Sequence, residues 1–316
     1  MKKYLAILTI LLAYATSFGQ TDTTLYPSYR TSVKTQTFRI KMNPSNTAAY
    51  LERYYYYNLL HQFPEALADI KKVIELNPTD HLAVNSLATL YMDAGDYPKA
   101  IEAFTHCMSL KKDFIDPYYG RALCYHEQGK YQLALNDLNV LEGMKSDFME
   151  YHLIMGNCKS KLGDNRGAIY DYRIILEKYP NSNEAYTNMG YTYFLIGDNV
   201  LALKNINKAL EIKPDYATAY AKRGLVKIAI DDIEGAIDDF TRAIELDPND
   251  SYSYGNRGSA KLILKDYPGA IKDLNKSIEI NPLNAESYKT RAAYYEEMGQ
   301  AELAKKDLQK FEELSR

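Results

Sequence analysis

The chain has 316 residues, of which 46% are hydrophobic and 25% charged, with 30 Tyr and no Trp. This composition is typical of a globular chain long enough for one large domain or a repeat array, and it excludes a largely disordered protein. The formal net charge of −3 argues against a nucleic-acid partner, because binding to phosphates requires a surplus of Lys and Arg.

The first 19 residues, MKKYLAILTILLAYATSFG, have the pattern of an export signal. Lys2 and Lys3 precede an apolar run over residues 5–14, and the small residues Ser17 and Gly19 follow it. The run is too short to span a bilayer comfortably, so a membrane anchor is the weaker interpretation. We expect cleavage near Gly19 and a periplasmic or secreted protein that does not span the membrane. Loss of two lysines moves the formal charge from −3 to −5.

Residues 20–46 form a segment that lies before the periodic part of the chain. Phe38, Ile40 and Met42 alternate with Arg39 and Lys41, which is a weak strand-like pattern. Three interpretations stay open for this segment. It is a flexible leader, an edge that a partner completes, or a stretch that lies against the first repeat.

The rest of the chain repeats with a period of 34 residues. Pro180, Pro214, Pro248 and Pro282 are spaced by this interval, and the same register extends back to Pro78 and Pro44 without an insertion. Residues 47–316 divide into eight units: 47–80, 81–114, 115–148, 149–182, 183–216, 217–250, 251–284 and 285–316. Positions within a unit are called places 1 to 34 below.

Small residues recur at two places of the unit and indicate a pair of closely packed helices. Place 20 is Ala in all eight units, and place 8 is Ala or Gly in seven, as in Ala236 and Gly224. Small side chains twelve residues apart let two antiparallel helices approach closely. Place 15 is expected to end the first helix in a left-handed turn, since it holds a glycine in five units: Gly95, Gly129, Gly163, Gly197 and Gly299.

This 34-residue pattern resembles the tetratricopeptide repeat (TPR), with an aromatic residue at place 4, a small one at place 8, Tyr at place 11, Ala at place 20 and Pro at place 32. The resemblance implies an all-α protein, a right-handed α-solenoid of eight helix–turn–helix repeats. Some residues depart from this pattern. Tyr54 takes the small place of the first unit, and His152 and Lys159 take aromatic places of the fourth. Nothing in the sequence explains His152.

Arg at place 7 pairs with Asp at place 23 along the chain. All five units with Arg at place 7 carry Asp at place 23, whereas the other three carry Ala103, Asp171 and Asn205 there. We therefore predict a salt bridge between the two helices of each such repeat, rather than a ladder of cations for an anionic ligand. The predicted pairs are Arg53–Asp69, Arg121–Asp137, Arg223–Asp239, Arg257–Asp273 and Arg291–Asp307.

The three cysteines are expected to fill the core. Cys124 and Cys158 lie one repeat apart at the same place, so stacked helices hold them too far apart for a disulfide. Whether Cys107 pairs with Cys124 stays open, although a buried free thiol is the favoured interpretation.

Signatures of catalysis, cofactor binding and metal binding are missing from the sequence. The five histidines have no H-E-x-x-H spacing, and neither G-x-S-x-G nor G-x-x-x-x-G-K-[ST] occurs. We expect a protein that is not an enzyme and that holds no cofactor or metal.

The TPR resemblance implies a ligand site on the concave side of the stacked repeats, at first-helix places 2, 5, 6, 9 and 12. In the fifth to seventh units this stretch is apolar and aromatic with few charges, which suits a peptide or protein ligand. Ile228 and Leu262 also fall there, but an apolar residue at helical spacing equally packs against the next helix. The candidate peptide-binding residues are Asn157, Thr187, Asn188, Tyr191, Phe194, Lys222, Leu225, Tyr252 and Asn256.

Some TPR domains bind the C-terminal carboxylate of chaperones, and this chain matches the residues of that site only in part. Asn157, Asn188 and Lys222 agree with it, but Leu153 and Thr218 stand where two cations belong. The chaperone clamp is therefore not expected. A different carboxylate remains a suitable ligand for Lys222 and the two amides.

Two classes of function follow from the sequence. The first is an exported scaffold that binds a peptide or protein in its groove, within a cell-envelope assembly. The second is a structural or oligomerising subunit that acts through its outer or terminal faces.

Overall fold

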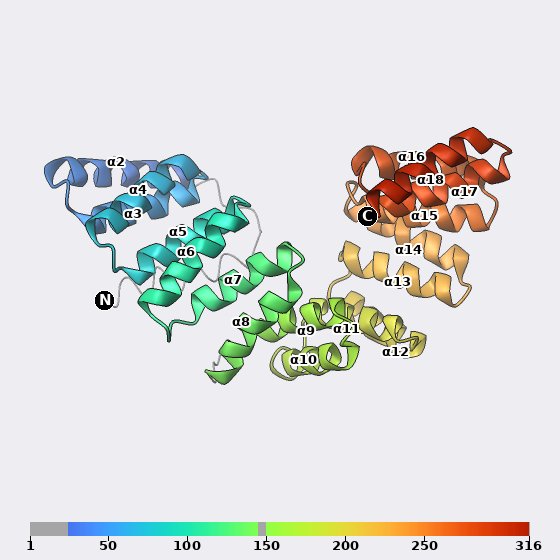
Figure 1. The fold of residues 1–316 in the computed structure, drawn as a ribbon, viewed down its shortest axis with the longest axis horizontal. Helices are drawn as coiled ribbons and strands as arrows, with labels where there is room; N and C mark the ends of the chain where they lie inside the picture. The colour runs from blue at the N-terminus through green and yellow to red at the C-terminus, as the bar shows by residue number, and fades with distance from the viewer. Residues whose placement is uncertain (1–24, 145–149, 316) are drawn as a thin grey trace. The chain divides into compact units, whose positions relative to one another are not determined.

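The computed structural model describes residues 25–144 and 150–315. These residues form α-helices joined by short turns, with no strand among them (Figure 1). The chain divides into two compact units, residues 1–146 and 147–316. The predicted export signal, residues 1–19, lies outside the described residues.

Within each unit the helices pair into hairpins, and neighbouring hairpins stack. The first unit contains α2 (Tyr26–Met42), α3 (Thr47–Leu59), α4 (Phe63–Leu76), α5 (His81–Asp93), α6 (Tyr97–Leu110), α7 (Asp116–Glu127) and α8 (Tyr131–Gly143). The second contains α9 (Tyr151–Lys161), α10 (Asn165–Lys178), α11 (Asn183–Leu195), α12 (Asn199–Ile212), α13 (Ala217–Ala229), α14 (Ile233–Leu246), α15 (Ser251–Ile263), α16 (Tyr267–Ile280), α17 (Ala285–Glu297) and α18 (Ala301–Leu314).

The turn inside each hairpin has the geometry that the glycines predicted. The five glycines at place 15 have positive φ angles between 69° and 85°. The same left-handed conformation occurs at this place in the other three repeats, at His61, Asp231 and Lys265, with φ of 55°, 64° and 60°. Place 15 therefore imposes its backbone conformation whichever residue occupies it.

The small residues bring the two helices of a hairpin together, as predicted. The Ala at place 20 is at most 2% exposed in every repeat. A Cβ added at Gly190 would lie 2.9 Å from the carbonyl oxygen of Ala202, and one added at Gly258 would lie 3.2 Å from that of Ala270. In the first repeat, Tyr54 instead buries its ring, and its hydroxyl donates a hydrogen bond to the Ser86 carbonyl oxygen at 3.4 Å.

The strand-like interpretation of residues 38–42 is wrong, because these residues belong to α2. This helix packs against α3, burying Gln36 and placing Ile40 in a core cluster with Tyr50 and Tyr54. Its Thr37 hydroxyl accepts a hydrogen bond from Arg53 at 3.0 Å. Of the three interpretations of this segment, the structure supports, for its described residues 25–46, a stretch that lies against the first repeat, in the position of a second helix.

The first helices of the second unit form one continuous row. Successive first helices α9, α11, α13, α15 and α17 contact one another, whereas successive second helices do not. Because the row of first helices is the more closely spaced, it lines the concave side of this stack. All nine candidate peptide-binding residues lie on α9, α11, α13 and α15.

Candidate functional site

A ladder of polar side chains crosses the concave side of the second unit. The side-chain oxygen Oδ1 of Asn157 accepts hydrogen bonds from the Tyr172 hydroxyl at 2.8 Å and from Asn188 Nδ2 at 3.0 Å. The Asn188 side-chain oxygen Oδ1 in turn accepts one from Lys222 Nζ at 2.7 Å. Three residues predicted from three different repeats are thus joined directly.

Lys222 ends this ladder as a partly buried cation that forms no ion pair with the described residues. Its Nζ lies 5.0 Å from the centre of the Tyr191 ring, and no carboxylate of the described residues lies within 4.0 Å of it. Burial, and secondarily the charge of Lys161, lowers the pKa of Lys222 to about 8, while the nearby Glu184 carboxylate opposes this shift. A ligand carboxylate would satisfy this ammonium group.

Apolar surface adjoins the ladder. The rings of Tyr191 and Phe194 lie 5.8 Å apart, and Phe194 also packs against the core cluster of the second unit. Leu225 is half-buried. Tyr252 is 63% exposed, so its ring is the most accessible aromatic group among the candidates. Asn256, at the same place as Asn188 and Lys222, is half-buried.

Thr187 does not belong to an accessible site, and its prediction is wrong. Its side chain is fully buried, and its hydroxyl donates a hydrogen bond to the Asn183 carbonyl oxygen at 2.8 Å. The cause is the contact between successive first helices. At the same place two repeats later, a Cβ added to Gly255 would meet Ser287 Oγ of the following first helix at 2.6 Å.

The five predicted Arg–Asp salt bridges are confirmed. In each of them the guanidinium donates to both carboxylate oxygens, over distances of 2.6–2.9 Å. The Asp side chains are only 3–7% exposed. These arginines therefore join the two helices of a repeat and do not form a cationic surface for ligands.

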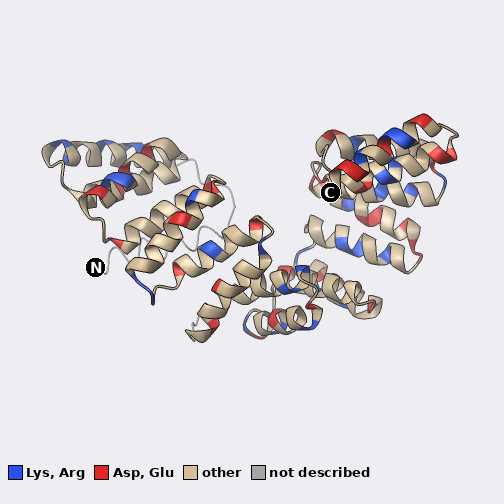
Figure 2. Ribbon diagram, viewed as in Figure 1, with Lys and Arg blue, Asp and Glu red and all other residues tan. Residues whose placement is uncertain are grey.

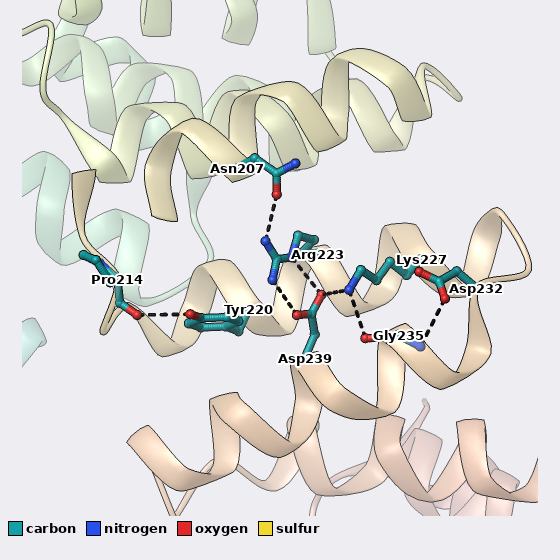
Figure 3. A network of polar contacts seen from close by, with 8 residues as sticks. All are labelled: Asn207, Pro214, Tyr220, Arg223, Lys227, Asp232, Gly235 and Asp239. Carbon is teal, nitrogen blue, oxygen red and sulfur yellow. Dashed lines mark hydrogen bonds and ion pairs between the residues drawn. The ribbon is translucent and has the colours of Figure 1, made fainter. Parts of the chain in front are cut away.

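Each of these arginines also reaches the preceding repeat, a contact that the sequence did not predict. Its Nη1 donates to the side chain at place 25 of the preceding second helix, over 2.7–3.0 Å. Figure 3 shows this arrangement for Arg223, which bridges Asp239 and Asn207, while Lys227 adds a second cation to Asp239 at 2.9 Å. The acceptors are Thr37, Thr105, Asn207, Thr241 and Asn275.

The fourth repeat explains His152. It has Met155 at place 7, so its buried Asp171 lacks the usual arginine. His152 Nδ1 lies 2.9 Å from Asp171 Oδ1, and Lys159 Nζ lies 2.7 Å from Oδ2. Two residues from the aromatic places thus replace one arginine as partners of the carboxylate.

The three cysteines are free and buried, and Cys107 does not pair with Cys124. The Cys107 thiol instead donates to the His81 carbonyl oxygen at 3.1 Å. Burial raises the pKa of each thiol to about 12, which leaves them protonated and unreactive.

In the two described ranges, 25–144 and 150–315, no group of three or more His, Cys, Asp or Glu side chains is arranged to hold a metal ion. Among the helices of these ranges, none combines the length and apolar character that crossing a bilayer demands.

Comparison with known proteins identifies the repeats. Tetratricopeptide repeat profiles match residues 60–105, 150–182, 184–216, 217–250, 240–272 and 274–306. No match to a curated protein was found.

Among solved structures, the chain is similar to MamA, with 30% identity over 51% of this chain and 94% of that one and a TM-score of 0.44. It is also similar to the APC/C hetero-tetramer Cut9-Hcn1, with 17% identity, a TM-score of 0.65, and coverage of 89% of this chain and 56% of that one. The second similarity concerns the fold alone. The described residues form an all-α repeat solenoid, and the profile matches span both of its units. The chain therefore belongs to the tetratricopeptide repeat family.

Proposed function

We propose that the chain is an exported scaffold that binds a peptide segment of a partner protein on the concave side of its second unit. Extended concave surfaces are what solenoids use to bind partners. The site is the polar ladder of Asn157, Asn188 and Lys222, with Tyr191 and Tyr252 beside it. The role is non-enzymatic, and an assembly in the cell envelope is the setting that the N-terminal export pattern favours.

The observation that carries this proposal is the state of Lys222. Its ammonium group is partly buried and donates a hydrogen bond to the neutral side-chain amide of Asn188. Burial lowers the pKa of Lys222, and no carboxylate of the described residues forms an ion pair with it. An unpaired cation in such a place costs stability, and a ligand carboxylate would recover that cost. The ligand is therefore a peptide whose C-terminus or acidic side chain reaches Lys222 while an apolar residue contacts Tyr191.

The proposal is tested by selecting peptides from a random heptapeptide library against the full chain. The affinities of selected peptides are then compared between the wild type and the Asn188→Ala/Tyr191→Ala variant. A loss of about tenfold or more in the variant supports the proposal, since both a polar and an aromatic contact are removed. Equal affinities would contradict it. Tyr170→Ala, which removes a 62% exposed tyrosine on the second helix α10, is the matched control.

A second candidate is a structural subunit that associates through a terminal face. It is favoured by α18, where Leu303 and Leu308 are 45% and 37% exposed on the last helix of the stack. Sedimentation of the full chain over a range of concentrations tests it. Self-association that Leu303→Glu/Leu308→Glu abolishes, with peptide binding retained, would favour this role, whereas a concentration-independent monomer would exclude it.

A further inference from the structure

The outward face of α2 differs from that of the other second helices. In five of those helices, place 26 is Lys or Arg and forms an ion pair over 2.6–2.9 Å with Glu at place 29. These pairs are Lys72–Glu75, Lys208–Glu211, Arg242–Glu245, Lys276–Glu279 and Lys310–Glu313. In α2 the corresponding residues are Phe38 and Lys41. A neutral ion pair is thus replaced by an aromatic ring and an unneutralised cation.

The charge of α2 is of one sign along its whole length. It contains Arg30, Lys34, Arg39 and Lys41 and no acidic residue (Figure 2). Arg39 lies 3.6 Å from Glu52 of α3. The other three cations have no carboxylate within 4.0 Å among the residues that the structure describes. This excess of positive charge stands out in a chain whose formal net charge is −3.

The unpaired cations share one face of α2 with two exposed apolar side chains. Residues three and four apart lie on the same side of a helix, so Arg30, Lys34, Phe38, Lys41 and Met42 form one stripe. Phe38 is 64% exposed and Met42 is 70% exposed. The opposite side, which includes the buried Gln36, faces α3. The stripe is therefore available to a partner while α2 stays packed in the fold.

We propose that this stripe docks the N-terminal end of the chain onto an anionic phospholipid surface. A helix that lies in a membrane interface buries Phe or Leu at the acyl boundary, while Lys and Arg on its polar side contact anionic headgroups. Each Lys or Arg near an anionic leaflet adds attraction, and Phe38 and Met42 are positioned to enter the headgroup region. The exposed Phe38 and Met42 beside the cations favour a membrane interface over an acidic protein segment, for which the charges alone would suffice. This surface is independent of the concave peptide site.

The test compares the binding of the full chain to phosphatidylglycerol-containing vesicles and to pure phosphatidylcholine vesicles by co-sedimentation. The measured quantity is the ratio of the two partition coefficients, because the apolar run of residues 5–14 contributes to both. The informative variant is Phe38→Lys/Lys41→Glu, which installs the ion pair of the other second helices and so preserves the helix. Lys276→Ala in α16 changes the net charge by the same −1 and is the matched control.

We expect the wild type to prefer the anionic vesicles, less so at high salt. In Phe38→Lys/Lys41→Glu this preference should fall by about fivefold, because the net charge of α2 drops by one, and in Lys276→Ala it should be retained. An unchanged preference in Phe38→Lys/Lys41→Glu, or no preference in the wild type, would overturn the proposal. Binding of the wild type to soluble polyglutamate without a vesicle preference would also overturn it, and would assign the stripe to an acidic polypeptide.

Discussion

Arg121 donates hydrogen bonds to both carboxylate oxygens of Asp137, from Nε at 2.8 Å and from Nη2 at 2.6 Å. Its Nη1 donates a third hydrogen bond, to the Thr105 hydroxyl at 2.8 Å. One guanidinium thereby connects three successive helices, α6, α7 and α8. The Asp137 side chain is 7% exposed and that of Arg121 is 18% exposed. The pair therefore contributes to the register between neighbouring hairpins as well as within one.

Asp137→Ala should lower the free energy of unfolding by about 3 kcal/mol, because it leaves a largely buried guanidinium without its partner. Urea denaturation monitored by circular dichroism measures this loss. The double variant Arg121→Leu/Asp137→Ala reproduces Leu87 and Ala103 of the second repeat. It should lose less than half as much stability. Equal losses in the single and double variants would contradict a stabilising role for the pairing itself.

The fourth repeat offers a second test of how a buried Asp is satisfied. His152→Tyr/Lys159→Tyr leaves the buried Asp171 carboxylate without either of its side-chain partners and should cost about 3–5 kcal/mol of unfolding free energy. Adding Met155→Arg to these two changes recreates the Tyr–Arg–Tyr–Asp combination of the first and third repeats. The triple variant should return to within about 1 kcal/mol of the wild type. A triple variant as unstable as the double one would show that the fourth repeat cannot adopt the common arrangement.

Lys265 has a φ of 60° at the place where five other repeats have glycine. Lys265→Gly should raise the free energy of unfolding by about 1 kcal/mol, because a left-handed conformation strains a residue that has a Cβ. Gly197→Ala, at the same place with a φ of 83°, should lower it by a similar amount. Thermal unfolding of both variants checks the two signs. A loss of stability in Lys265→Gly would contradict the explanation.

Gly190→Ala should destabilise the second unit by about 1–3 kcal/mol. The added Cβ would lie 2.9 Å from the Ala202 carbonyl oxygen, which is backbone and cannot move aside as a flexible side chain does. Gly143→Ala is the control, because no atom outside its own helix lies within 4 Å of the added methyl group. In urea titrations, an unchanged midpoint for Gly190→Ala would refute the close approach.

The hairpins and the Arg–Asp pairs could be predicted from the sequence because they repeat. Small residues such as Gly224 and Ala236 recur at places 8 and 20, and Asp at place 23 accompanies every Arg at place 7. The repeats of one chain could therefore be compared with one another. The role of His152 could not be predicted, because the residues that replace an arginine in the fourth repeat come from other places of the unit.

Features that depend on contacts between neighbouring helices also could not be predicted from the sequence. Thr187 is buried by the contact between successive first helices, which the pattern of one helix does not contain. The helix α2 has Ser32 at place 20 instead of the recurring Ala, and its buried side includes the polar Gln36. The alternation of apolar and basic residues over 38–42 therefore suggested a strand. That no carboxylate of the described residues lies within ion-pair distance of Lys222 is a property of the assembled concave side.

The central claim is that Lys222 recognises a ligand carboxylate in its protonated form. Because burial lowers its pKa to about 8, Lys222 is mainly charged at pH 7 and mainly neutral at pH 9.5. The most direct measurement is calorimetric titration of one selected acidic peptide at these two pH values into the wild type and Lys222→Met. We expect the affinity of the wild type to fall by about tenfold or more on raising the pH, and that of Lys222→Met to be weak and nearly independent of pH. An equal pH dependence in both proteins, or full affinity in Lys222→Met, would contradict the account.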